Sequence, residues 1–153
     1  MQSIALSQTH LLSIRSHAEN TYPEECCGLL LGTIAGNVKT LVAVWPTKNA
    51  WSSETEDNCS EAKILTKKRR YAISPQDMLE GMKEGRDRNL DIIGIYHSHP
   101  DGQAVPSECD RTLAWPQYSY VIVSVPQGSG EDVRSWTLDT ENKFQAEEIL
   151  TVD

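Results

Sequence analysis

The sequence predicts an α+β fold in which a mixed β-sheet is flanked by helices. Two segments, residues 7–21 and 74–89, have the apolar spacing and the end signals of helices. Short apolar runs bounded by glycine and proline lie between and after them, and such runs are typical of strands. The chain of 153 residues has the length of one domain. Because it has no internal repeat or linker, we expect residues 1–153 to form a single domain.

The first half of the chain predicts a helix followed by a pair of strands. The helix begins after Ser7, a plausible N-cap, and its pattern stops at Pro23. Its apolar residues recur at helical spacing: Leu11, Ile14 and Ala18. Residues 27–32 form a short apolar run that ends in glycine, which indicates a strand buried on both faces. Residues 38–45 are its natural pairing partner.

The second helix has clear start signals. Ser74 is a cap residue, and Pro75 occupies the first helical position, where a missing backbone N–H costs nothing. The helix is expected to end near Asn89. Met78 and Met82 share one of its faces, so we expect both to lie in the core.

The rest of the chain alternates between strands and turns. Residues 91–99 are strand-like, and proline and glycine then force a loop before a short helix that opens at Ser107. Strands over 118–125 and 132–138, with a weaker one near the C-terminus, complete the sheet. Among the four tryptophans we expect Trp51, in a polar stretch, to touch a substrate and most of the others to be core.

Composition limits the kinds of partner and compartment. The net charge of -8 argues against nucleic acid or an anionic membrane as the main partner, because its field repels phosphate. A neutral or basic partner fits better. No run is apolar enough to span a bilayer, and residues 1–14 lack the features of a signal peptide, so we expect a cytoplasmic protein. In that compartment the cysteines should stay reduced: Cys26, Cys27, Cys59 and Cys109.

The most informative segment is His97-Ser98-His99-Pro100, with Ser107 and Asp110 downstream. Residues two apart on a strand point to the same side, so His97 and His99 present two imidazoles to one point. The following loop can fold back and add the carboxylate of Asp110. Two nitrogens and one anionic oxygen suit zinc, and three protein ligands leave one position open, which is the mark of a catalytic site. We therefore expect one zinc ion per chain.

An open position on zinc has a definite chemical use. A water molecule bound there has its pKa lowered to about 7, which makes it a nucleophile at neutral pH. Glu24 or Glu25 would reach this water if the strand at 27–32 neighbours the strand at 91–99, and either could act as general base. Ser107 could donate its hydroxyl to the oxyanion that forms as a carbonyl becomes tetrahedral.

These residues match the motif of a known family. A glutamate, then His-x-His-Pro, six residues and Ser-x-x-Asp resembles the JAMM (MPN-plus) zinc metalloproteases. Residues 23–32, Pro-Glu-Glu-Cys-Cys-Gly-Leu-Leu-Leu-Gly, look like the family's N-terminal signature. The resemblance runs over most of the chain and is greatest to the short prokaryotic members. It implies a curved mixed sheet of the MPN/JAB1 type, with an architecture like that of cytidine deaminases.

The resemblance also implies a role for each residue of the motif. It makes His97, His99 and Asp110 the zinc ligands, selects Glu25 over Glu24 as the catalytic glutamate, and makes Ser107 the oxyanion donor. The implied reaction is hydrolysis of a peptide or isopeptide bond after the C-terminal Gly-Gly tail of a ubiquitin-like or sulfur-carrier protein. The family's eukaryotic deubiquitinases grip ubiquitin with two insertions, and here only residues 50–70 offer room for the first.

Each signal also has an alternative interpretation. The two histidines could be ordinary strand residues, and Ser107-x-x-Asp110 is also a capping box, which could coexist with a metal ligand at the helix start. Glu25 could be only a solvated carboxylate. A non-catalytic MPN-type scaffold that binds protein partners without metal is the main functional alternative. A cysteine hydrolase that uses Cys27 or Cys109 with a histidine is a further one.

Overall fold

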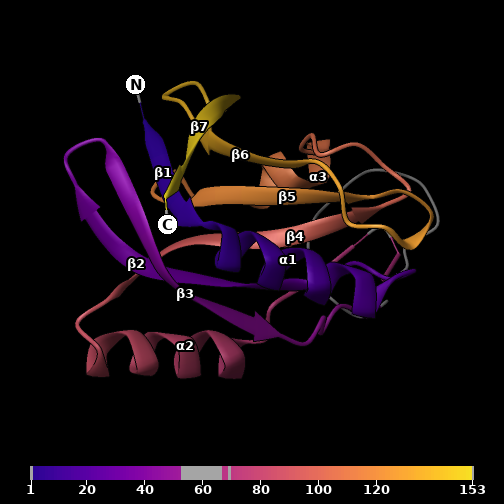
Figure 1. The fold of residues 1–153 in the computed structure, drawn as a ribbon, viewed down its shortest axis with the longest axis horizontal. Coiled ribbons are helices and arrows are strands. Elements are labelled where there is room, and N and C mark those ends of the chain that lie inside the picture. Colours follow the sequence, from indigo (N-terminus) through magenta and orange to yellow (C-terminus); the bar gives the residue numbers. More distant parts are fainter. Residues whose placement is uncertain (1, 53–66, 69, 153) are drawn as a thin grey trace.

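The computed structural model describes residues 2–52, 67–68 and 70–152, and in them seven strands close into a barrel in the order β1-β3-β2-β4-β5-β6-β7 (Figure 1). The strands are β1 (Ser3–Ser7), β2 (Cys27–Ala35), β3 (Val38–Thr47), β4 (Asp91–Pro100), β5 (Ser119–Val125), β6 (Val133–Leu138) and β7 (Phe144–Val152). The helices are α1 (Gln8–Thr21), α2 (Pro75–Asp87) and α3 (Glu108–Leu113), with a 3-10 turn η1 (Pro126–Gly128). None of these helices is long and apolar enough to cross a membrane.

The sheet is mixed, as the sequence predicts. β2 pairs antiparallel with both β3 and β4, and β6 pairs antiparallel with β5 and β7. β4 and β5 are parallel, so the chain must cross over between them. That crossover contains α3 and the loop before it. The parallel pairing thus brings the loop and α3 to the end of β4, where the two histidines lie.

Helices cover the two faces of the sheet. On one face the buried residues of α1 pack into the larger core cluster, against Leu30, Tyr96 and Val121. On the opposite face Met78 of α2 packs with Leu29 and Ile95 in a second cluster. Successive residues of β2 and β4 thus contribute to different clusters, as the alternation of a strand requires.

The fold class is confirmed, and the two long helices have nearly the predicted bounds. Two expectations about the core are wrong. Met82 is 55% exposed, because the buried face of α2 is narrower than its apolar pattern suggests. Trp51 is only 5% exposed, whereas Trp115 is 60% exposed. The Trp51 backbone N–H donates to the side-chain oxygen of Asn49, two residues earlier, which forms a local turn at the buried tryptophan.

Candidate metal centre

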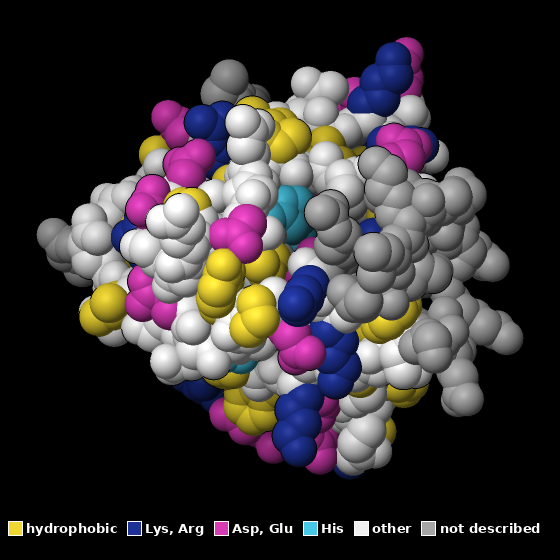
Figure 2. Space-filling view, turned by 90° about the vertical axis from the view of Figure 1, so that its right-hand side faces the viewer, with side chains coloured by type: hydrophobic (Ala, Val, Ile, Leu, Met, Phe, Trp, Pro, Cys, Tyr) yellow, Lys and Arg dark blue, Asp and Glu magenta, His cyan; other side chains and the backbone are white. Residues whose placement is uncertain are grey.

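The strand β4 presents both histidines on the face that α2 and α3 cover. Ile95 belongs to the cluster under α2, and His97 and His99 follow it at intervals of two residues. His97 is fully buried and His99 is half-buried. Figure 2, which views the molecule from the right-hand side of Figure 1, shows a histidine (cyan) at the surface near the centre, with acidic and hydrophobic side chains around it.

Helix α3 holds the side chain of Asp110, which joins the two histidines at the centre. Ser107 is the N-cap, and its Oγ accepts a hydrogen bond from the backbone N–H of Asp110 at 3.0 Å. The backbone N–H of Ser107 donates in return to Oδ2 of Asp110 at 2.9 Å. This reciprocal pair is the predicted capping box, and it holds the Asp110 carboxylate in one orientation at the helix start. The cap therefore coexists with a carboxylate that points at the histidines.

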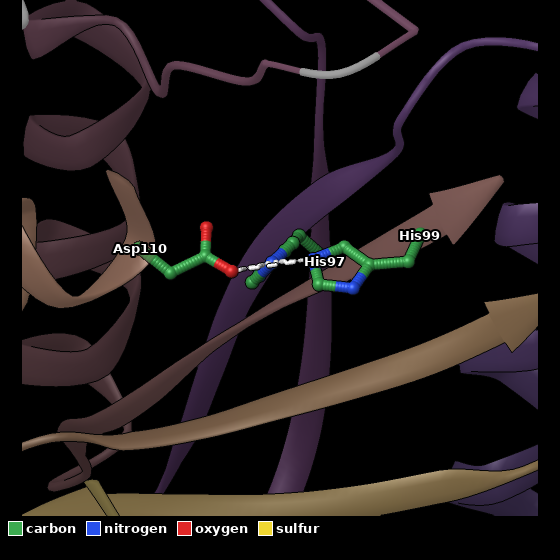
Figure 3. A group of neighbouring side chains, drawn as sticks. All are labelled: His97, His99 and Asp110. Carbon is green, nitrogen blue, oxygen red and sulfur yellow. Dashed lines mark hydrogen bonds and ion pairs between the residues drawn. The ribbon is translucent and has the colours of Figure 1, made fainter. Parts of the chain in front are cut away.

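Three ligand atoms converge on one point, as Figure 3 shows. Oδ2 of Asp110 lies 3.2 Å from Nε2 of His97 and 3.2 Å from Nε2 of His99, and the two nitrogens are 3.1 Å apart. Zinc bonds of about 2.0–2.2 Å in a tetrahedron put neighbouring ligand atoms about 3.3–3.6 Å apart. The triangle is within a few tenths of an ångström of that size. The prediction that these three side chains converge is confirmed, and the geometry fits a metal ion.

The hydrogen bonds indicate how the His99 ring is protonated. Nδ1 of His99 lies 2.8 Å from the carbonyl oxygen of Gln103. A carbonyl only accepts, so Nδ1 carries the proton and Nε2 of the neutral ring directs a lone pair at the centre. This backbone bond is the orienting contact that metal-bound histidines usually have. For His97, Nδ1 has no hydrogen-bond partner among the described residues.

The charges favour a neutral His97 ring beside an anionic Asp110 carboxylate. Burial lowers the pKa of His97, which keeps this ring neutral at neutral pH. Burial acts on His99 in the same direction, but the hydrogen bond and the charge of Asp110 outweigh it, so its pKa is raised. Burial would raise the pKa of Asp110, yet the two imidazoles outweigh it and hold that pKa well below its usual range. The Asp110 carboxylate is therefore anionic at neutral pH, as a metal ligand would need to be.

An aromatic ring that sequence reasoning missed forms one wall of the centre. Tyr71 stacks on His97 with ring centroids 4.4 Å apart and planes inclined by 22°. Burial raises the pKa of Tyr71 well above its usual value, and the charges of Asp110 and Glu25 add to the effect. Both carboxylates are thus near the Tyr71 phenol. The stacked ring restricts the plane of His97, whose Nδ1 has no described partner to do so.

Glu25 lies two residues before β2, the strand that pairs with β4. Cys27 lies opposite His97 in the antiparallel pair, and the Ser98 N–H donates to the Cys26 carbonyl at 3.2 Å. Continuing this register by one residue places Glu25 opposite His99. Glu25 is 5% exposed, whereas Glu24 is exposed. The expected neighbourhood of the two strands is confirmed.

The cysteines differ from expectation at one position. Cys26 and Cys27 are free thiols, as predicted, and burial raises their pKa values to about 12 and about 11. Such thiols are poor nucleophiles at neutral pH, which argues against a cysteine hydrolase that uses Cys27. The prediction that Cys109 stays reduced is wrong, because Cys109 is disulfide-bonded. Sequence spacing carries no information on which thiols approach each other in space. Cys59 lies outside the described residues.

Comparisons with known proteins agree with the geometry. The family model described as prokaryotic homologs of the JAB domain matches residues 7–139. A desampylase from Haloferax volcanii is 32% identical over 132 residues, which cover 83% of each chain. A CysO-cysteine peptidase from Mycobacterium tuberculosis is 28% identical over 124 residues, covering 80% of this chain and 74% of the relative.

Solved structures share the fold. A protein from Desulfitobacterium hafniense superposes with a TM-score of 0.80 at 26% identity, over 98% of this chain and 93% of that one. A JAB1/MPN domain protein from Archaeoglobus fulgidus has a TM-score of 0.54 at 17% identity, over 100% of this chain and 98% of that one. The family match spans the helix α1, the strand β4 with its two histidines and the capped Asp110. The chain therefore belongs to the prokaryotic JAB-domain family.

Proposed function

We propose that this protein is a zinc-dependent isopeptidase that cleaves the bond after the C-terminal Gly-Gly tail of a ubiquitin-like or sulfur-carrier protein. The observation that carries the proposal is the triangle of His97, His99 and Asp110, whose three ligand atoms lie 3.1–3.2 Å apart. Three protein ligands leave the open position that a catalytic zinc needs. The desampylase and CysO-cysteine peptidase relatives support this kind of substrate.

The chain's own residues divide the work of hydrolysis. His97, His99 and Asp110 would hold one zinc ion, which when bound lowers the pKa of water and polarises a carbonyl. The Glu25 carboxylate would take a proton from the attacking water and pass it to the leaving amine. The Ser107 hydroxyl would donate to the oxyanion. Its Oγ already accepts from the Asp110 N–H, so its own proton is available for that bond.

The substrate rather than a nucleic acid or a membrane is the proposed partner. A net charge of -8 suits a neutral or basic protein surface better than a phosphate backbone. We also propose that the protein is cytoplasmic and that residues 1–153 form one domain. Residues 53–66, the larger part of the one segment with room for a gripping insertion, lie outside the described residues.

Two substitutions test the proposal and separate the residue roles. Glu25→Gln should keep about one zinc per chain and lose turnover of a Gly-Gly-linked conjugate by about 10²-fold or more, because it removes the base alone. Asp110→Ala should lose both zinc and turnover, because it removes a ligand. Metal content is measured on protein purified without chelator or nickel, and turnover by following the release of the tail's leaving amine.

The controls distinguish the two rival functions. A chelator should abolish turnover and added zinc should restore it, whereas a thiol reagent should have little effect. The opposite response to these two reagents would favour a cysteine hydrolase. Zinc-free protein that shows no turnover even after zinc is added would favour the non-catalytic scaffold. Retained turnover in Glu25→Gln would remove Glu25 from the role of base.

A further inference from the structure

The side chain of Asn49 uses all of its hydrogen-bonding positions beside the metal centre. Asn49 follows the end of β3. Its Nδ2 donates to the carbonyl oxygens of Glu25 at 3.0 Å and Arg70 at 2.9 Å. Its Oδ1 accepts from the backbone N–H groups of Trp51 at 3.0 Å and Ala72 at 3.2 Å. Each of the four partners fits one orientation of the amide, since rotating it by 180° would oppose donors to donors and acceptors to acceptors.

Three of these four bonds join two segments that both reach the centre, and the fourth, from the Trp51 N–H, closes the turn that contains Asn49 itself. One is the residue Glu25, whose backbone N–H also donates to the Lys67 carbonyl at 2.7 Å. The other is the segment 70–72, in which Tyr71 stands between the two residues that Asn49 holds. A further backbone bond from the Ala50 N–H to the Ala72 carbonyl, 2.8 Å long, secures the same segment.

The two segments carry different parts of the site. Glu25 is the proposed base, and Tyr71 stacks on the ring of His97 at 4.4 Å. A single amide thus connects the backbone of the base with the residues that flank the ring on a metal ligand. Asn49 itself is not one of the three proposed metal ligands, which are His97, His99 and Asp110.

We infer that Asn49 is a positioning residue, which sets the Glu25 backbone and the Tyr71 ring relative to the metal ligands; this inference rests on the proposed function. Removing its amide leaves two carbonyls and two N–H groups without their partner, so both segments loosen together. Small displacements are costly in catalysis, where about 1 Å of misplacement can lower a rate about 10²-fold. Loss of a group that orients a metal ligand typically weakens metal binding or activity about 10–100-fold.

The test is Asn49→Ala, measured for both zinc affinity and turnover. We expect the zinc dissociation constant to rise about 10-fold, because the Tyr71 ring no longer restricts His97. At saturating zinc we expect kcat to fall about 10–100-fold with KM within about 3-fold, because Asn49 bonds only backbone groups of this chain and has no proposed contact with substrate.

A matched control is available in the turn between β6 and β7. The Asp139 carboxylate also stabilises a turn, because it accepts hydrogen bonds from the backbone N–H groups of Glu141 and Lys143 and from the side-chain amide of Gln145. Asp139→Ala should lower the melting temperature and leave zinc affinity and kcat unchanged. The inference is overturned if Asn49→Ala behaves in the same way, with loss of stability alone.

Two further variants keep the test decisive if Asn49→Ala folds poorly. Asn49→Asp keeps the acceptor for Ala72 and loses both donors, and it should show the same fall in kcat. Tyr71→Leu should weaken zinc binding by itself, and adding Asn49→Ala to it should weaken binding little more. Strict additivity of the two changes would contradict the proposed route through Tyr71.

The zinc measurement also separates this inference from the proposed function. If the parent protein cleaves no Gly-Gly-linked conjugate, the proposed function fails. The zinc affinities of the Asn49 and Asp139 variants still decide whether Asn49 positions the centre. If the parent does cleave the conjugate and Asn49→Ala matches it in kcat and zinc affinity, only the present inference fails.

Discussion

At the scale of single residues, Ser107 joins helix capping to the proposed chemistry, and the two contributions can be measured apart. Ser107→Ala removes the N-cap of α3, which should cost about 1 kcal/mol of folding free energy. It also removes the proposed oxyanion donor, which should lower kcat about 10²–10³-fold. The first effect is measured by chemical unfolding and the second by steady-state turnover at saturating zinc.

Ser74 provides the control for this substitution. Its Oγ caps α2 by accepting from the Asp77 N–H at 3.0 Å, the same distance as in the Ser107 cap. Ser74 lies at the start of a different helix and is not a member of the metal centre. Ser74→Ala should therefore lose similar stability and keep its turnover. A similar kcat in the two variants would mean that Ser107 is a cap and nothing more.

The residues of the centre differ in how far sequence could predict them. His97, His99 and Asp110 follow from local rules, because strand alternation and helix capping operate over two or three residues. Tyr71 and Asn49 reach the centre only through tertiary pairing. Asn49 bonds to Glu25 across 24 positions of the chain. No spacing rule covers such distances, so these supporting residues became evident only in the folded chain.

At the scale of elements, the pairing of β2 with β4 aligns the two halves of the site and depends on a missing side chain. A Cβ at Gly28 would overlap the ring of Tyr96, which is fully buried and whose hydroxyl lies 2.7 Å from Nδ1 of His17. Gly28→Ala should therefore cost at least about 1–3 kcal/mol of folding free energy, because neither ring nor strand can move freely.

The measurement is chemical unfolding of Gly28→Ala beside Gly102→Ala. At Gly102 the nearest atom to a new Cβ is 3.5 Å away, an ordinary contact. The control should thus be close to the parent. Because Gly28 adjoins Cys27, which lies opposite His97, the Gly28 variant should also bind zinc more weakly. Equal stability of the two variants would show that the β2–β4 pair can absorb the added methyl group.

Elements with local signals were predicted well, and those defined by distant pairing were not. The bounds of α1 and α2 follow from cap residues and apolar spacing, which lie within the segments themselves. The strand β1 has only five residues and no turn signal of its own, and the sequence did not predict it. It pairs in parallel with both β3 and β7, so its place depends on chain segments at both ends. The curved sheet closes into a barrel through this strand.

At the scale of the whole molecule, the metal centre is separate from the larger core cluster and adjoins the smaller one, against which Tyr71 packs. The larger core cluster packs between α1 and the sheet, and the ligands lie on the opposite face, under α2 and α3. A chain of 153 residues buries about 70% of the surface that its unfolded form exposes, which is enough for stability without a metal. A metal bound by His97, His99 and Asp110 would therefore add to a fold that already exists.

The separation of the centre from the larger core cluster predicts how the protein responds when zinc is removed. The metal-free protein should unfold cooperatively, with native circular dichroism, because the larger core cluster lies on the face of the sheet opposite the ligands. Zinc at 100 times its dissociation constant should add about 2.7 kcal/mol to the folded state. For a domain of this size that corresponds to a rise of about 5–10 °C in Tm. Asp110→Ala should lose the rise and keep a cooperative transition, although part of its stability goes with the capping box. A metal-free protein without a cooperative transition would instead make the zinc a structural requirement, and the open-position argument for hydrolysis would lose its basis.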